Sequence, residues 1–223
     1  MTRKKTNATI TEPLLKKGVA VAKKLQEMEE HAYACGILPD AAKFLRKMEE
    51  LGLLPEDYYM SGLLEWLDDQ DSGFTYEEYE KFESAKRNVD WKGYLLHYWS
   101  GEKRGGIAAF IQIAKWQLEQ YKFFANKLFG VTHCLDVINK PETFVPFIFD
   151  FLSVLRVVRV LHGLDLQECG EYIKQHGNAT FKDIPRIRLI QKFVDENKKV
   201  PMKTDDPKRK RRRGKVKTNG AIP

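Results

Sequence analysis

Residues 107–129 read IAAFIQIAKWQLEQYKFFANKLF and form the most regular stretch of this 223-residue chain. Its apolar side chains return every three or four positions, at Ile107, Phe110, Ile111, Ala114, Leu118, Tyr121, Ala125 and Leu128. This spacing places one apolar stripe along an α-helix. The stretch therefore predicts a long helix that packs against other helices.

The same periodicity, with capping residues and prolines at helix starts, predicts helices on both sides of this stretch. Before it they cover Thr11 to about Ala34 with a stop at Gly36, Pro39 to Gly52, one helix from Pro55 through Tyr59, Leu63, Trp66 and Leu67, Thr75 to about Asn88, and Trp91–Trp99. After it they cover Phe144–His162, Asp165–Gln175 and Ile184–Lys198. Alternating strand patterns are scarce, so we expect an all-α, compact multi-helix bundle of about seven or eight helices.

The chain divides into three parts by composition. We expect a basic arm over residues 1–10, a helical domain over 11–200 and a basic tail over 201–223. The helical domain forms either one body or two lobes divided near residues 100–106 or 130–142. The tail contains Pro201, Pro207, Gly214 and Gly220 without apolar periodicity, which predicts disorder in isolation.

The net charge of +7 is concentrated in the tail. Residues 201–223 hold nine Lys and Arg against two Asp, so residues 1–200 balance to zero. Within those, residues 1–25 carry +6, residues 26–90 carry −11 and residues 91–200 carry +5. The acidic segment is either a solvated face of the N-terminal helices or a surface that receives a basic one, from the tail or from another copy of the chain.

The densest run of cations in the tail is PKRKRRRGKVK at residues 207–217. A run of this kind binds phosphates with release of counterions, and it also resembles a monopartite nuclear localisation signal. The alternative is a tail that only keeps the protein soluble. The candidate nucleic-acid-binding residues here are Lys208, Arg209, Lys210, Arg211, Arg212, Arg213, Lys215 and Lys217.

A second candidate site combines aromatic residues with a glycine-rich loop before residue 107. Lys103 and Arg104 lie in that loop, where a helix N-terminus and two cations suit a phosphate. The nearby aromatic rings are candidates for stacking on the bases of a single strand. The alternative is that the rings belong to the core and the two cations to an exposed turn. The base-stacking candidates are Trp91, Tyr94, Tyr98 and Trp99.

Two further groups of cations lie on predicted helices. Arg156 and Arg159 are one turn apart in an otherwise apolar helix, where they either extend to solvent or line a basic groove, with Asp150 as a candidate partner. Arg186, Arg188 and Lys192 make the last helix basic, which fits contact with a phosphate backbone.

No pattern in the chain points to catalysis, a metal or a cofactor. The nucleophile-elbow, Walker and dinucleotide-binding motifs are absent, and residues 68–80 fit an EF-hand loop in neither register. The three cysteines are widely spaced and the N-terminus lacks an apolar signal-peptide region, so we expect neither a disulfide framework nor secretion. The apolar stretch from Phe144 to Leu161 contains Asp150, Arg156 and Arg159, which argues against a membrane span.

Together these features predict a non-enzymatic protein that binds RNA or DNA through the phosphate backbone and self-assembles on the strand, as viral nucleoproteins and packaging proteins do. Homo-oligomers would form between the acidic residues 26–90 and basic surfaces. The alternative is a nuclear protein-interaction module whose tail is only a localisation signal. In either case we expect no membrane partner, and a nuclear location if the source is eukaryotic or a virus of eukaryotes, or otherwise an intracellular one.

Overall fold

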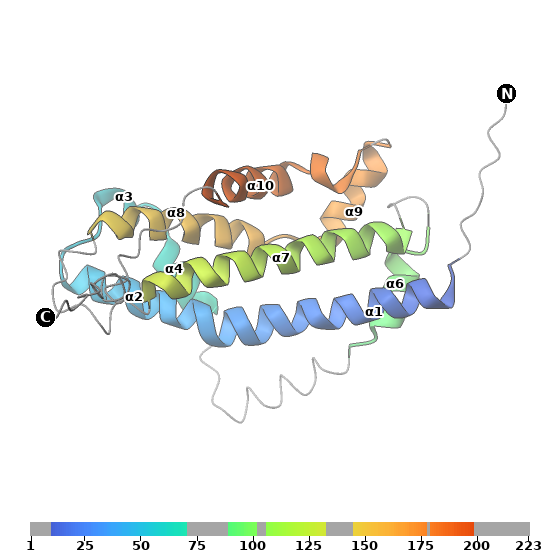
Figure 1. Ribbon diagram of the computed structural model, residues 1–223, viewed down its shortest axis with the longest axis horizontal. Helices are drawn as coiled ribbons and strands as arrows, with labels where there is room; N and C mark the ends of the chain where they lie inside the picture. The colour runs from blue at the N-terminus through green and yellow to red at the C-terminus, as the bar shows by residue number, and fades with distance from the viewer. Residues whose placement is uncertain (1–9, 71–88, 102–105, 133–144, 178, 199–223) are drawn as a thin grey trace, which may run out of the picture.

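The computed structural model describes residues 10–70, 89–101, 106–132, 145–177 and 179–198, and those ranges are helical with no strand (Figure 1). The all-α prediction is therefore confirmed. In chain order the elements are α1 (Glu12–Glu27), the π-helical segment η1 (Met28–Ile37), α2 (Leu38–Glu50), α3 (Glu56–Tyr59), α4 (Leu63–Gln70), α6 (Trp91–Tyr98), α7 (Gly106–Thr132), α8 (Val145–His162), α9 (Leu166–Gln175), the 3₁₀ turn η5 (Phe181–Asp183) and α10 (Pro185–Lys198).

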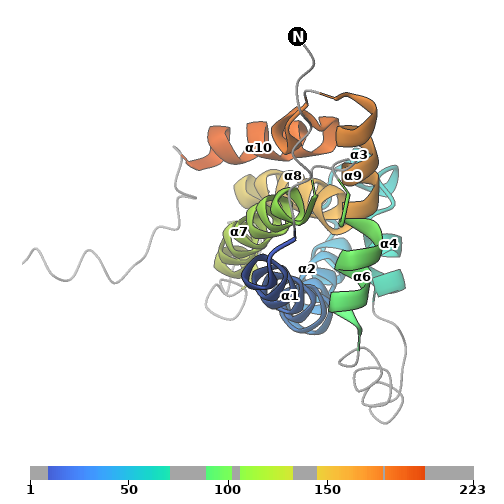
Figure 2. The same ribbon diagram turned by 90° about the vertical axis from the view of Figure 1, so that its right-hand side faces the viewer.

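Helix α7, which contains residues 107–129, is the central element of the bundle (Figure 2). It packs against α1 and η1 on one side and against α8, α9 and η5 on the other. The predicted stripe is buried except for Leu118 and Ala125, which are partly buried, and Ile113, Trp116 and Phe124 outside it are buried as well. The helix is therefore apolar over most of its circumference, as expected of a helix surrounded by neighbours.

The first two predicted helices form one continuous helical rod, so the predicted stop at Gly36 is wrong. Glycine costs only about 1 kcal/mol inside a helix, which tertiary packing readily offsets. The turns widen into the π-helical segment η1 just before Pro39. Wider turns accommodate a proline, which lacks an N–H and crowds the carbonyl four residues earlier.

The single helix predicted from Pro55 is two helices, α3 and α4, separated by a turn at residues 60–62. Gly62 adopts a φ of 58°, a left-handed conformation that ends helices and suits glycine. Tyr59, which the helical spacing placed on one face with Leu63, Trp66 and Leu67, is 60% exposed because the chain turns immediately after it. The helix predicted from Thr75 lies outside the described residues.

The remaining helices agree with the predicted ranges to within three residues, close to the usual uncertainty of helix ends. Asp90 caps α6 by accepting a hydrogen bond from the Gly93 N–H, and Asp165 caps α9 through the Gln167 N–H. One hydrophobic core runs through the described elements from Leu15 to Val194. Its largest fully buried side chains include Trp99, Tyr121, Phe44 and Phe110.

Candidate nucleic-acid interface

The two arginines of α8 are exposed, and both bind the α3–α4 segment. Arg156 forms an ion pair with Asp57 at 3.0 Å, so its partner is not the Asp150 considered from the sequence. Arg159 donates hydrogen bonds to the carbonyl oxygens of Ser61 (3.1 Å) and Gly62 (3.5 Å). These guanidinium groups hold the turn after α3 against α8, which leaves fewer donors for a phosphate.

The arginines at the start of α10 also contact groups of the protein itself. Arg186 donates to the Gly163 carbonyl oxygen at 3.0 Å and to Glu168 at 3.3 Å, and Arg188 lies 3.9 Å from Asp183. Lys192 is exposed. Because Arg188 is 72% exposed and its ion pair is long, Arg188 and Lys192 remain the accessible cations among the three residues predicted on α10.

The tryptophans at the two ends of α6, Trp91 and Trp99, are packed more deeply than base stacking requires. Trp99 is fully buried, so its ring cannot stack on a base, and that prediction is wrong for this residue. It contacts Phe110 of α7 at 5.4 Å between ring centroids. Trp91 is partly buried, and its indole N–H donates to Gln26 of α1 at 2.9 Å. These two rings attach α6 to the rest of the bundle.

The two tyrosines of α6 differ in exposure. Tyr94 is partly buried, lies 6.3 Å from the Phe110 ring, and burial raises the pKa of its hydroxyl. Tyr98 is 36% exposed and lies against Tyr94 and His97 at 5.1 and 4.5 Å. Of the four predicted rings, Tyr98 is therefore the one most accessible to a base.

Several predicted site residues lie outside the described residues. They are Lys103 and Arg104 of the glycine-rich loop and all the tail cations from Lys208 to Lys217. The glycine-rich loop and the tail therefore stay as sequence predictions.

The prediction missed a group of lysines on α1 and α7. Lys17, Lys23, Lys24, Lys115 and Lys122 are exposed, and no ion pair joins any of them to a described residue. A signal was present in the sequence. Lys16 and Lys23, Lys17 and Lys24, and Lys115 and Lys122 are each seven residues apart, which is two helical turns along one face.

An open pocket of about 590 Å³ lies between α9 and the start of α10. Leu164, Cys169 and Ile184 are among its lining residues, as are Glu168 and Arg186. Cys169 is 2% exposed, and burial, with Asp165 and Glu168 nearby, raises the pKa of its thiol to about 12. The thiol is therefore protonated at neutral pH and is a poor nucleophile.

The described ranges contain neither a metal-binding cluster nor a membrane-spanning helix. No group of three or more His, Cys, Asp or Glu side chains there is arranged to hold a metal ion. No helix of those ranges is long and apolar enough to cross a bilayer.

Comparison with known proteins adds no relative to this picture. No protein-family model, curated protein or solved structure matches the chain.

Proposed function

We propose that this chain is a non-enzymatic nucleic-acid-binding protein that contacts the phosphate backbone, chiefly through residues 208–217. One observation carries the proposal, the division of charge between the tail and the body. The described ranges hold 19 Lys and Arg against 21 Asp and Glu, whereas residues 201–223 hold nine against two. A nearly neutral body with a strongly basic tail concentrates the attraction for a polyanion in one segment.

The physical basis is counterion release, which makes affinity fall linearly with the logarithm of the salt concentration. The slope is about 0.9 per phosphate contact for duplex DNA and about 0.7 for single strands. Arg156 and Arg159 of α8 support only a limited role for that helix in phosphate contact, because both bind α3 or the turn after it. Self-assembly on the strand belongs to the same proposal, with the acidic residues 26–90 against basic surfaces of another copy.

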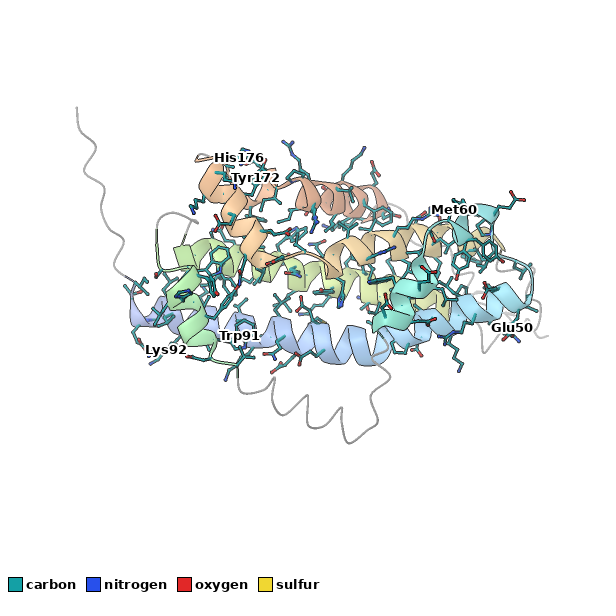
Figure 3. All side chains as sticks on the ribbon, turned by 180° about the vertical axis from the view of Figure 1, so that it is seen from behind. Glu50, Met60, Trp91, Lys92, Tyr172 and His176 are labelled. Carbon is teal, nitrogen blue, oxygen red and sulfur yellow. The ribbon has the colours of Figure 1, made fainter. Side chains whose placement is uncertain are left out.

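A second candidate function is a nuclear protein-interaction module whose tail is only an address. The observation that favours it is an exposed apolar pair at the end of α3. Met60, labelled in Figure 3, is 89% exposed and Tyr59 is 60% exposed, and Glu56 and Asp57 precede them in the chain. Exposed large apolar side chains with charged neighbours are typical of protein contacts.

Fluorescence anisotropy with labelled single-stranded and duplex oligonucleotides over a KCl series separates the two candidates. The test variant replaces Arg209, Lys210, Arg211, Arg212 and Arg213 with Gln in the full chain. A matched control removes five exposed body cations, Lys43, Lys47, Lys174, Lys182 and Lys198, in the same way.

The proposal predicts steep salt dependence for the unmodified protein and the control, and a large loss of affinity for the tail variant. If the unmodified protein binds neither oligonucleotide at low salt, the nucleic-acid function is wrong. The interaction module would then be the better account, and nuclear import assays of the tail variant would test it.

A further inference from the structure

We propose that Lys17 and Lys24 of α1 with Lys115 and Lys122 of α7, here called the lysine row, form a second phosphate-contacting surface on the folded body. The inference rests on the proposed function and assigns to the body a part of the contact with the strand. It differs from the residues predicted from sequence, none of which lies on α1 or α7.

Helices α1 and α7 run parallel and in a fixed register (Figure 1). A Cβ at Gly18 would lie within 4 Å of Ile107 and Ile111, and eleven residues later Glu29 accepts hydrogen bonds from Gln117 and Tyr121, both at 3.1 Å. Both helices thus advance together. Along the shared axis this register puts Lys24 level with Lys115.

The solvent-facing side of α7 is one narrow stripe that borders α1. Lys115 comes one turn after Ile111, which lies beside Gly18 of α1. Gln112 belongs to the same stripe but lies on its α10 side. Trp116 follows Gln112 by one turn, and its indole N–H donates to Gln191 of α10 at 2.8 Å. Lys115, and Lys122 two turns on, therefore lie at the α1 edge of the stripe, and Glu119 lies at the α10 edge.

On α1 the two lysines lie on the flank away from α6. Gln26 marks the α6 flank through its bond to Trp91. Lys17 and Lys24 follow Leu14 and Val21 by three residues, on the opposite flank of the buried stripe. Figure 2 shows α6 and α7 on different sides of α1. The lysines of both helices therefore border one surface. Glu27 lies outside that surface, on the outer face of α1.

The lysine row is free to bind a ligand. All four side chains are exposed, and none forms an ion pair or hydrogen bond with a described residue. By contrast, the exposed arginines Arg156, Arg159 and Arg186 each bind a group of the protein. A cation without an intramolecular partner breaks no bond within the protein when it pairs with a phosphate, so its costs are partial loss of hydration and of side-chain freedom.

The surface fits a nucleic-acid backbone better than a membrane. A peripheral membrane helix inserts an apolar face into the headgroup region. The apolar face of α1 is buried in the bundle instead, through Leu15, Val21, Ala22 and Leu25. What remains for a partner is a set of cations on rigid helices, which suits the phosphates of a strand.

The experiment measures the salt dependence of binding by the full chain to a labelled single-stranded oligothymidylate. The test variant is K17Q/K24Q/K115Q/K122Q, and the charge-preserving variant replaces the same four lysines with Arg. The matched control is K43Q/K174Q/K182Q/K198Q, which removes four exposed lysines from other faces. The tail variant described above is measured in parallel, and circular dichroism verifies that each protein is folded.

If the lysine row contacts phosphates, the slope of log K against log salt falls by about 3 in the test variant, at about 0.7 per contact. The Arg variant and the matched control keep the unmodified slope. An unmodified slope in the test variant together with a reduced one in the tail variant overturns the lysine row and leaves the proposed function intact. If no protein binds the oligonucleotide, the proposed function fails.

Anionic phosphatidylserine vesicles provide the last arm of the test. Nucleic-acid contact predicts that vesicle binding is equal in the test variant and the matched control. If the test variant loses vesicle binding but keeps the unmodified slope on the oligonucleotide, the row is a membrane-surface contact and the inference is wrong.

Discussion

The α1–α7 face and the α8–α10 face carry similar numbers of cations but use them differently. On α8 and α10 the arginines reach Asp57, Ser61, Gly163 and Glu168, and these bonds connect helices. On α1 and α7 the lysines of the row meet no described carboxylate. The number of charges on a helix therefore does not measure its capacity to bind a polyanion, because cations that already pair within the fold contribute to stability instead.

The largest expected effect comes from Phe110→Ala, which removes the ring that joins α6 to α7. Phe110 is fully buried and contacts the rings of Trp99 and Tyr94. We expect the free energy of unfolding in urea to fall by about 3–5 kcal/mol. Gln112→Ala, at an exposed position of the same helix, should change it by less than about 0.5 kcal/mol. A loss below about 1 kcal/mol at Phe110 would contradict the central position of α7.

The next largest effect comes from Gly18→Val, at the contact between the two helices that carry the lysine row. A Cβ at Gly18 would lie 2.8 Å from Leu95 Cδ1 and 3.0 Å from Ile107 Cγ2. We expect Gly18→Val to destabilise the protein by about 1–3 kcal/mol through overpacking. Ala20→Val, which is exposed on the same helix, controls for the helix propensity of valine. Thermal unfolding of both variants measures the difference, and equal melting temperatures would disprove close packing at Gly18.

A third prediction compares Arg159, on the α8–α10 face, with Lys24, on the α1–α7 face. Arg159→Gln removes hydrogen bonds to Ser61 and Gly62, so we expect a loss of about 1 kcal/mol in stability and no change in the salt dependence of oligonucleotide binding. Lys24→Gln should leave stability unchanged and lower the slope by about 0.7. Denaturant titration and anisotropy test the pair, and two variants with the same profile would remove the distinction between the faces.

The smallest effect concerns Tyr58 of α3, close to the arginine contacts of α8. Its hydroxyl is buried without a hydrogen-bond partner in the described part of the chain, so Tyr58→Phe should change stability at neutral pH by less than about 1 kcal/mol. Burial, with Glu49 nearby, raises the pKa of Tyr58 to about 12. Between pH 10 and 12 the unfolded chain releases this proton while the folded protein keeps it, so stability falls as pH rises.

Unfolding measured at several pH values in that window tests the second part of the Tyr58 prediction. The phenylalanine variant should lose less stability than the unmodified protein between pH 10 and 12. A parallel decline in both proteins would mean that the Tyr58 hydroxyl titrates normally.

Sequence periodicity identified most helices of the fold but missed two features, the continuity of the helix through Gly36 and the turn after Tyr59. The stripes of α7, α8 and α10 each span several turns, so the pattern is unambiguous. Gly36 and the turn after Tyr59 were misjudged because glycine both ends helices and occurs inside them, and the choice depends on packing from outside the segment. The candidate site was predicted less well. Trp99 lies in a polar, glycine-rich sequence context but is buried against Phe110.

The sequence by itself determined the helical class and the concentration of positive charge in residues 201–223. Both are local properties, since periodicity and charge do not depend on which segments meet. The tertiary structure alone decided which cations have partners. Asp57 and Arg156 are 99 residues apart, and Lys24 lies level with Lys115 through contacts made by Gly18 and Glu29. Ion pairing falls off steeply with distance in water, so it follows from the packing of the helices and not from their order along the chain.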